Sequence, residues 1–308
     1  MIKLKRSASY IIIGIAFLLL FTCNYESDPV DPNNHKLLFP SIGETLIQGN
    51  TYLIRWQDDR STSLRIRLLK SGSSYLRISD EASNTGEFNW TIPDTLEAEG
   101  VYAIKIMSND DDFIQYESET PFKIIKPSMT GSFTDPRDGQ VYKTVKLANR
   151  WWMAENFNFD TTGSYCYNKD MSNCELYGRL YTLGTARMAA PSGWHLPTDN
   201  EWRTLEAYLG IPDDELFSPG FRGVNAGELL LSEDGVGFNA LLSGYMYYRW
   251  AERYYSLNTG TYFWSSSYDQ SQARYWVRKL TSIAGGIERS AMSGGQYAYS
   301  VRYIKDEE

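Results

Sequence analysis

Short blocks of alternating apolar and polar residues between 37 and 125 constrain the fold more than any other feature of the sequence. In the block 51–56, Tyr52, Ile54 and Trp56 recur at every second position, which places them on one face of a β-strand. Turn-forming Asp, Asn, Ser and Gly residues separate this block from its neighbours. The series predicts an all-β sandwich, with strands at 37–39, 51–56, 64–69, 75–79, 87–92, 101–107 and 121–125.

The first 22 residues have the pattern of a secretory leader. Lys3, Lys5 and Arg6 precede an apolar run from 10 to 21. This run is shorter than the ~20 residues that span a bilayer. We therefore interpret residues 1–22 as a signal peptide.

The residues Leu20-Phe-Thr-Cys23 resemble the lipobox of bacterial lipoproteins, in the looser form that is typical of the Bacteroidetes. The resemblance implies that Cys23 becomes a lipid-modified N-terminus and that the lipid anchors the chain in the outer membrane. Glu26 and Asp28 resemble the acidic signal that sends such lipoproteins to the cell surface. The alternative is an ordinary secretory signal with an incidental cysteine. Residues 23–36 are polar and predict a tether.

The charge and the rare residues exclude several classes of function. The formal net charge is −8, and loss of the three basic leader residues makes it −11. A surface this acidic predicts no nucleic-acid partner. Only two His, His35 and His195, and three Cys are present, which disfavours multi-ligand zinc sites and His-dependent nucleophiles. We expect no cofactor, no metal and no catalytic residue.

The strand blocks of the first region resemble a known domain. Residues 52–56, 84–93, 102–106 and 122–124 are similar to the immunoglobulin-like N-terminal domain of the Ser-Thr-rich, glycosylphosphatidylinositol-anchored fungal cell-wall family, which also occurs in bacterial surface proteins. The resemblance implies an immunoglobulin-like β-sandwich over residues 37–126. Pro, Gly and small polar residues then predict a linker at 127–132.

The second region, 133–308, is richer in Trp, Tyr and Gly and predicts strands, long loops and few helices. Thr198 and Glu201 form a capping box, after which apolar residues recur at helical spacing until Gly210. This pattern predicts a helix. Residues 181–188 are a weaker helix candidate.

Ten ordered motifs in this region resemble the Fibrobacter succinogenes major paralogous domain. They include Trp152-Met-Ala-Glu-Asn156, Tyr177-Gly-Arg-Leu-Tyr181, Pro191-Ser-Gly-Trp-His-Leu-Pro197 and Phe263-Trp-Ser-Ser266. The resemblance implies an exported bacterial domain with an α+β fold like that of C-type lectins and the formylglycine-generating enzyme. The chain lacks the lectin motif Glu-Pro-Asn and has no Cys beyond Cys174. The resemblance therefore implies neither the sugar binding of C-type lectins nor the activity of the formylglycine-generating enzyme for this chain.

The family pattern also bears on the cysteines. The family usually has a Cys before Pro-x-Gly-Trp and another after Val-Arg near the C-terminus, where this chain has Ala190 and Tyr303. Both partners of that pair are missing together. We predict that the remaining Cys166 and Cys174 form a disulfide, because the chain is exported and lipid occupies Cys23. Two free thiols are the alternative, because short spacing does not ensure bond geometry.

Residues 245–268 contain ten aromatic residues in 24, where the chain average of 15% predicts about four. Phe263 and Trp264 are expected in the core. We predict that the aromatic residues with charged neighbours form a ligand-binding surface: Tyr247, Tyr248, Trp250, Tyr254 and Tyr255. Tyr and Trp suit stacking on sugars or peptides, and the interleaved charges are costly to bury unpaired. The alternative is that these rings also fill the core.

His195 is the one histidine of the second region, and Glu155 and Glu201 are isolated in the sequence. We expect His195 to be buried and hydrogen-bonded to the backbone, not catalytic.

These features together predict a surface-exposed, lipid-anchored bacterial protein that is not an enzyme. We expect a binding or adhesion module for a glycan or a surface protein. Two alternatives remain open: an enzyme that uses carboxylates on a polysaccharide, and a structural subunit that assembles through sheet edges.

The lipid anchor gives a first testable prediction. Replacement Cys23→Ala removes the only atom to which the lipid would attach, so the chain should leave the membrane fraction. Fractionation followed by immunoblotting measures this, and a variant that stays with the membrane would reject the assignment.

Overall fold

The computed structural model describes residues 36–41, 43–58, 60–98, 100–112, 114–117, 121–233 and 235–307. The predicted signal peptide, Cys23 and nearly all of the tether lie outside these residues. His35–Glu308 forms one compact unit. None of the helices in the described stretches is long and apolar enough to cross a membrane.

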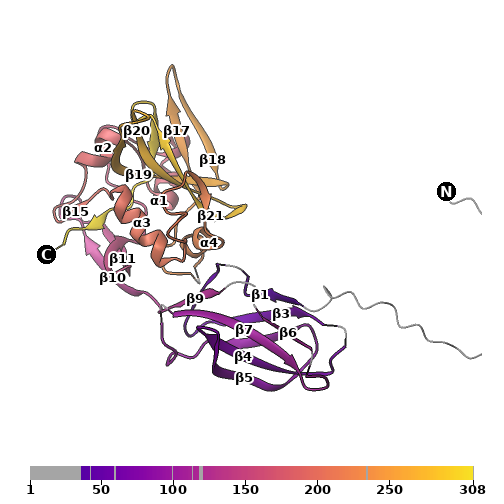
Figure 1. Ribbon diagram of the computed structural model, residues 1–308. Coiled ribbons are helices and arrows are strands. Elements are labelled where there is room, and N and C mark those ends of the chain that lie inside the picture. The colour runs from indigo at the N-terminus through magenta and orange to yellow at the C-terminus, as the bar shows by residue number, and fades with distance from the viewer. Residues whose placement is uncertain are drawn as a thin grey trace, which may run out of the picture. The chain divides into compact units, whose positions relative to one another are not determined.

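The first domain is a sandwich of two antiparallel-rich sheets (Figure 1). The smaller sheet has the order β1 (Lys36–Phe39), β3 (Thr51–Gln57), β6 (Glu87–Thr91). The larger sheet has the order β2 (Thr45–Ile47), β9 (Phe122–Ile125), β7 (Gly100–Ser108), β4 (Ser63–Lys70), β5 (Ser73–Ser83), and β8 (Gln115–Glu117) pairs with β7. All seven predicted blocks are strands. The sequence analysis missed β2 and β8, because three residues are too few to show a period.

The core of this sandwich follows from the alternation in the sequence. Ile54 and Trp56 of β3 face Ile66 of β4 and Ile104 of β7, and all four are buried in one cluster. The Trp56 indole N–H donates a hydrogen bond to Asn84 Oδ1 at 2.7 Å. A turn residue thus satisfies the polar atom of a buried core indole.

The predicted linker 127–132 is too long. Strand β10 begins at Met129 and runs to Thr134, and it pairs with β11 (Val141–Leu147) from its first residue. Residues 129–132 therefore belong to the second domain. Gly and Ser are weak strand formers, so this segment is a strand because it pairs with β11 and not because of its own propensity.

The second domain has two sheets and short helices. A five-stranded sheet has the order β10, β11, β12 (Arg150–Met153), β23 (Ile304–Lys305), β15 (Trp194–His195). The larger sheet has the order β13 (Ser164–Tyr165), β14 (Leu180–Thr182), β22 (Tyr297–Tyr299), β17 (Ser243–Tyr248), β19 (Gly260–Asp269), β20 (Arg274–Thr281), β21 (Ala284–Met292), β16 (Gly220–Arg222), and β18 (Glu252–Leu257) pairs with β17. The helices are α1 (Met171–Tyr177), α2 (Leu183–Met188), α3 (Asp199–Tyr208) and α4 (Ala226–Leu231). The protein is thus mostly β.

The capping box is confirmed at the start of α3. The Thr198 hydroxyl accepts a hydrogen bond from Glu201 N at 3.1 Å, and the Glu201 carboxylate accepts one from Thr198 N at 2.8 Å. The weaker helix candidate 181–188 is wrong at its start, because Leu180–Thr182 pairs with β22 and the helix begins only at Leu183.

The predicted disulfide between Cys166 and Cys174 is confirmed. At the two positions where the family has cysteines, Ala190 and Tyr303 lie in the same apolar cluster. The Tyr303 hydroxyl donates a hydrogen bond to Ala186 O at 2.7 Å. A buried ring and one hydrogen bond therefore occupy the place of a second covalent link.

Arg302 lies in the interior of the second domain, only 1% exposed. Its guanidinium donates hydrogen bonds to four acceptors: Asn156 Oδ1 at 2.7 Å, Met153 O at 3.1 Å, Phe238 O at 2.7 Å and Asn239 O at 2.8 Å. Burial lowers the pKa of this guanidinium to about 9, so it stays protonated at neutral pH. One side chain thus satisfies carbonyls from two segments that make no ladder with each other.

Replacement Arg302→Met tests this role. It removes the donor to three carbonyls, two of which are buried, so the free energy of unfolding should fall by about 3–5 kcal/mol, as for other broken buried polar networks. Urea unfolding measures the change. The matched control Arg77→Met removes an exposed guanidinium that pairs with Asp80, and it should cost less than about 1 kcal/mol. Equal losses in the two variants would contradict the assigned role.

Candidate functional site

The five aromatic residues predicted to bind a ligand lie on one hairpin, formed by β17 and β18. The two strands are antiparallel, with Tyr247 opposite Arg253 and Tyr248 opposite Glu252. Figure 1 shows this hairpin extending beyond the rest of the second domain. Its tip is formed by residues 249–251.

The pairing places the rings on two faces of the hairpin. Tyr247 and Tyr255 share one face with Tyr245, because residues two apart on a strand point the same way and Tyr255 lies opposite Tyr245. The Tyr245 and Tyr255 rings are stacked with centroids 5.3 Å apart, and the Tyr247 ring lies 5.1 Å from Tyr297. This face continues a row of tyrosine rings across the larger sheet.

Tyr248 and Tyr254 lie on the opposite face. Both pack against a small apolar cluster around Tyr167 and Met246, and the Tyr167 and Tyr254 ring centroids are 5.2 Å apart. Burial raises the pKa of the Tyr254 hydroxyl, and the nearby Glu252 carboxylate adds to the shift. The five predicted residues therefore do not form one continuous surface.

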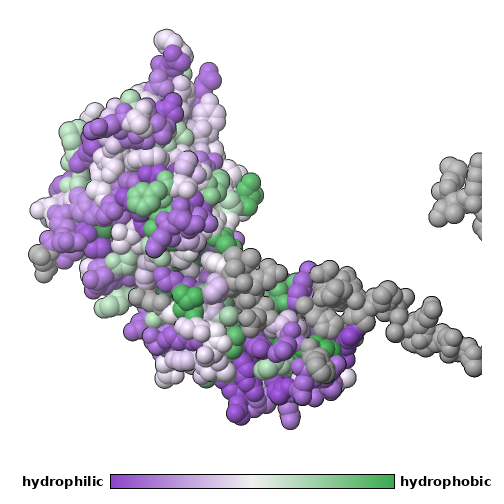
Figure 2. All heavy atoms as spheres, viewed as in Figure 1, coloured by the Kyte–Doolittle hydropathy of each residue, from purple (hydrophilic) through white to green (hydrophobic). Residues whose placement is uncertain are grey.

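Trp250 stands apart from both faces. It lies at the tip of the hairpin and is 90% exposed. The Arg249 guanidinium lies 5.6 Å from the centre of its ring, within the range of a cation–π contact. In Figure 2 the outer end of this hairpin is mainly purple and pale, so its residues are mostly hydrophilic. The exposed part of the predicted surface is thus Trp250 with Tyr255 and the exposed Arg249 and Arg253.

The prediction that Phe263 and Trp264 lie in the core is confirmed. Phe263 and Trp264 are both buried in the core, on opposite faces of β19. The Trp264 indole N–H donates a hydrogen bond to Tyr181 O at 2.7 Å. The aromatic-rich segment therefore divides into core, hairpin faces and exposed tip.

The expectation that His195 is buried and hydrogen-bonded to the backbone is wrong. The ring is half-buried and contacts side chains on both sides, with Nδ1 next to Asp306 Oδ1 and Nε2 at 2.9 Å from Glu201 Oε1. The Glu201 hydrogen bond is the largest cause that raises the pKa of His195, and Asp306 adds to it. Burial opposes ionisation of Glu201, but His195 and Thr198 outweigh it and lower the Glu201 pKa to about 2. The ring links β15, the start of α3 and the C-terminal segment. Its contacts therefore hold these three parts of the second domain together.

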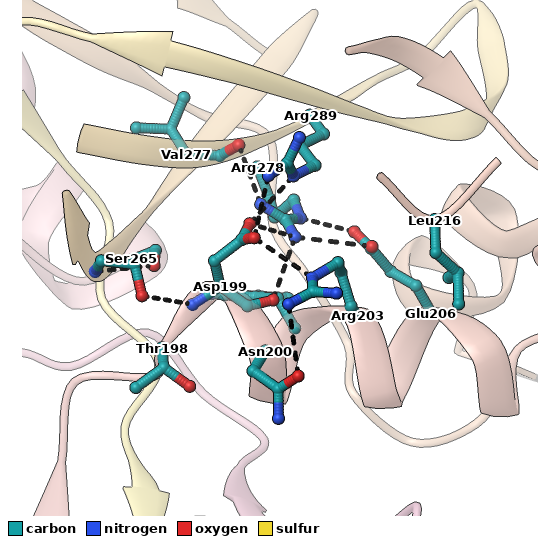
Figure 3. A network of polar contacts seen from close by, with 12 residues as sticks. Thr198, Asp199, Asn200, Arg203, Glu206, Leu216, Ser265, Val277, Arg278 and Arg289 are labelled. Atoms are coloured by element: carbon teal, nitrogen blue, oxygen red, sulfur yellow. Dashed lines mark hydrogen bonds and ion pairs between the residues drawn. The ribbon is translucent and has the colours of Figure 1, made fainter. Parts of the chain in front are cut away.

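Two further carboxylates lie close together inside the domain. Asp199 is bound by Arg289 at 2.9 Å, and Glu206 is bound by Arg222 at 2.8 Å and by Arg278 (Figure 3). Glu206 is 0% exposed. A glycosidase needs two carboxyl groups that reach a sugar across a cleft, whereas guanidiniums hold these two below the surface. The pair therefore gives no support to the enzymatic alternative.

The other polar candidates have structural contacts. Glu155 accepts a hydrogen bond from Lys143 N at 2.9 Å. Within the part of the chain that the structure describes, no group of three or more His, Cys, Asp or Glu side chains is placed to hold a metal ion.

The fold defines a two-domain, mostly β protein with an exposed hairpin, and the two families that its domains match suggest a surface- or cell-wall-associated protein. The family model of the Fibrobacter succinogenes major domain matches residues 145–305, and the chain belongs to this family. The model of the Kre9/KNH-like N-terminal immunoglobulin-like domain matches residues 39–124. Both resemblances seen in the sequence are thereby confirmed. A search of curated proteins found no match.

The His195 contacts give a prediction on pH. A histidine whose pKa is raised on folding stabilises the protein fully below its unfolded pKa of about 6.5, and the stabilisation is lost as the pH rises through the raised value. The melting temperature should therefore fall as the pH rises above about 6.5. His195→Gln should flatten this slope, and thermal melts between pH 5.5 and 9 measure it. An unchanged slope in the variant would contradict the assignment.

Proposed function

We propose that the chain is an outer-membrane lipoprotein that displays a binding domain on the bacterial cell surface. The secretory leader, the lipobox-like residues before Cys23 and membership of a family of surface and secreted proteins support the location. The immunoglobulin-like domain acts as a spacer. The second domain has the C-type-lectin-like architecture that the family resemblance implies, and it makes the contact with the partner.

The observation that carries the proposal is the exposure of Trp250. Leaving an indole in water is unfavourable by the hydrophobic effect, so a 90% exposed Trp at a projecting tip is suited to burial against a partner. Trp, Tyr and Arg are also the residues that dominate binding hot spots. Trp250 and Arg249 at the tip are two of these types, and the exposed Tyr255 on β18 is the third.

The shape of the site favours a macromolecular partner. A projecting hairpin inserts into a depression on another surface and does not enclose a small molecule. Of the two ligand classes expected from the sequence, a surface protein therefore fits the tip better than a glycan does. The chain acts through binding, without catalysis.

Replacement Trp250→Ala tests the proposal. Binding of the purified, labelled chain to whole bacterial cells should weaken by about tenfold or more, because hot-spot truncations cost about 2 kcal/mol. The free energy of unfolding should change by less than about 0.5 kcal/mol, as for other surface sites.

The matched control is Ile283→Ala, which removes a 94% exposed apolar side chain from a different hairpin turn. It should leave binding unchanged. Protease treatment of the target cells should abolish binding to a protein partner, whereas periodate oxidation should abolish binding to a glycan. Full binding by Trp250→Ala would reject the hairpin as the contact surface.

A further inference from the structure

A cavity of about 430 Å³ lies on the five-stranded sheet of the second domain. It is separate from the β17–β18 hairpin, and its lining includes residues from all five strands. Cavities that hold small ligands are of this size. Six residues carry the argument: Gly131, Phe133, Thr144, Trp151, Trp194 and Lys305.

The register of the sheet brings these residues to one face. Gly131 lies opposite Thr144, and Trp194 lies opposite Lys305. Trp151 follows the same alternation, because its neighbour Trp152 pairs with Ile304 and points to the other face. The face away from the cavity packs into one apolar cluster through Trp152 and Ile304. The cavity face is therefore fixed by strand pairing.

Three aromatic side chains form the walls of the cavity. The Phe133 and Trp194 rings are tilted by 53° with centroids 5.1 Å apart. Trp194 is buried, whereas Phe133 and Trp151 are half-buried and keep part of each ring open. The walls thus offer flat apolar ring faces at an angle to one another.

Gly131 keeps the floor of the cavity open. A Cβ built at this position would lie 3.0 Å from Thr144 Oγ1 and 3.3 Å from the Trp151 ring. Gly131 does not have a positive φ, so the backbone does not require glycine here. Its missing side chain is what leaves the Trp151 ring and the Thr144 hydroxyl accessible.

Two polar groups of the cavity have no partner in the part of the chain that the structure describes. Thr144 is only 5% exposed, and its hydroxyl makes no hydrogen bond to any described residue. The indole N–H of Trp151 likewise makes no hydrogen bond to any residue that the structure describes. The Thr144 hydroxyl faces the cavity, so a ligand bound there can hydrogen-bond to it in place of solvent.

We propose that this cavity binds one sugar ring of a saccharide. A pyranose has an apolar face of C–H groups that stacks on an aromatic ring and a rim of hydroxyls that both donate and accept hydrogen bonds. It matches the open rings and the Thr144 hydroxyl at the same time. A purely apolar ligand leaves that hydroxyl unpaired, and so does an aromatic peptide side chain that only stacks. The hairpin of the proposed function is a separate site, and neither proposal depends on the other.

Ligand-observed NMR titrations of the full chain test the proposal. The probes are the methyl β-glycosides of glucose, galactose and N-acetylglucosamine, and N-acetyl-tryptophanamide represents an aromatic peptide side chain. The detergent must lack a sugar headgroup, because such a headgroup would compete for the cavity. We expect at least one glycoside to bind with a Kd of about 1 mM or tighter, and the amide not to bind.

Two variants assign the binding to the cavity. Thr144→Val keeps the shape and removes only an unpaired hydroxyl, so the Kd should rise by about 3–10-fold without loss of stability. Gly131→Val fills the space beside Trp151 and should abolish binding. Thr130→Val, the same substitution on the other face of β10, lies opposite Val145 and should change nothing.

Three results would overturn the proposal. In the first, no glycoside binds at concentrations of several times 1 mM. In the second, a glycoside binds but neither Thr144→Val nor Gly131→Val alters its Kd. In the third, only the tryptophan amide binds. Trp250→Ala should leave the glycoside Kd unchanged, so failure of the hairpin and failure of the cavity are distinguishable.

Discussion

Buried guanidiniums supply the hydrogen bonds that the loops of the second domain do not make among themselves. The domain has long irregular connections, whose carbonyls need donors once they are withdrawn from water. A guanidinium offers five N–H groups in a fixed plane, more than any other side chain. Arg302 bonds the carbonyls of Phe238 and Asn239, Arg222 bonds Leu216 O at 2.8 Å and Arg289 bonds Phe217 O at 2.8 Å. The loops therefore take their shape from these arginines.

The arginines of this interior also set the charge state of Asp199. Burial opposes ionisation of Asp199, but Arg289 and Arg278 outweigh it and lower its pKa. Such a carboxylate is a poor general acid at neutral pH, because it holds no proton to give. Arg203 adds a further cation beside Asp199 at 3.2 Å. Asp199 and Glu206 thus act as counter-ions for the arginines.

The sequence predicts local features well and long-range placement poorly. The period of two in residues 37–125 and the capping box at Thr198 depend on neighbours in the chain, and both predictions are confirmed. Adjacent Tyr247 and Tyr248 cannot share a face of one strand. Once this segment is known to be a strand, the sequence therefore predicts that the tyrosines lie on two faces of the hairpin. The cavity on the five-stranded sheet could not be predicted from the sequence, because only strand pairing brings Gly131 and Lys305 to the same cavity. The prediction for His195 was wrong partly for the same reason, since Asp306 is 111 positions away; Glu201 is only six positions away, but the sequence assigned it to the capping box alone.

The position of β23 has a consequence for how the protein folds. This strand lies between β12 and β15 in the sheet, although it follows both by more than a hundred residues in the chain. Contacts of such large sequence separation are formed late, because the loop-closure entropy is lost before the contacts form. Until β23 inserts, Trp151 and Trp194 lie on incomplete strands with unpaired backbone edges, the state in which β proteins aggregate. We therefore expect the closing of this sheet to be a late step of folding.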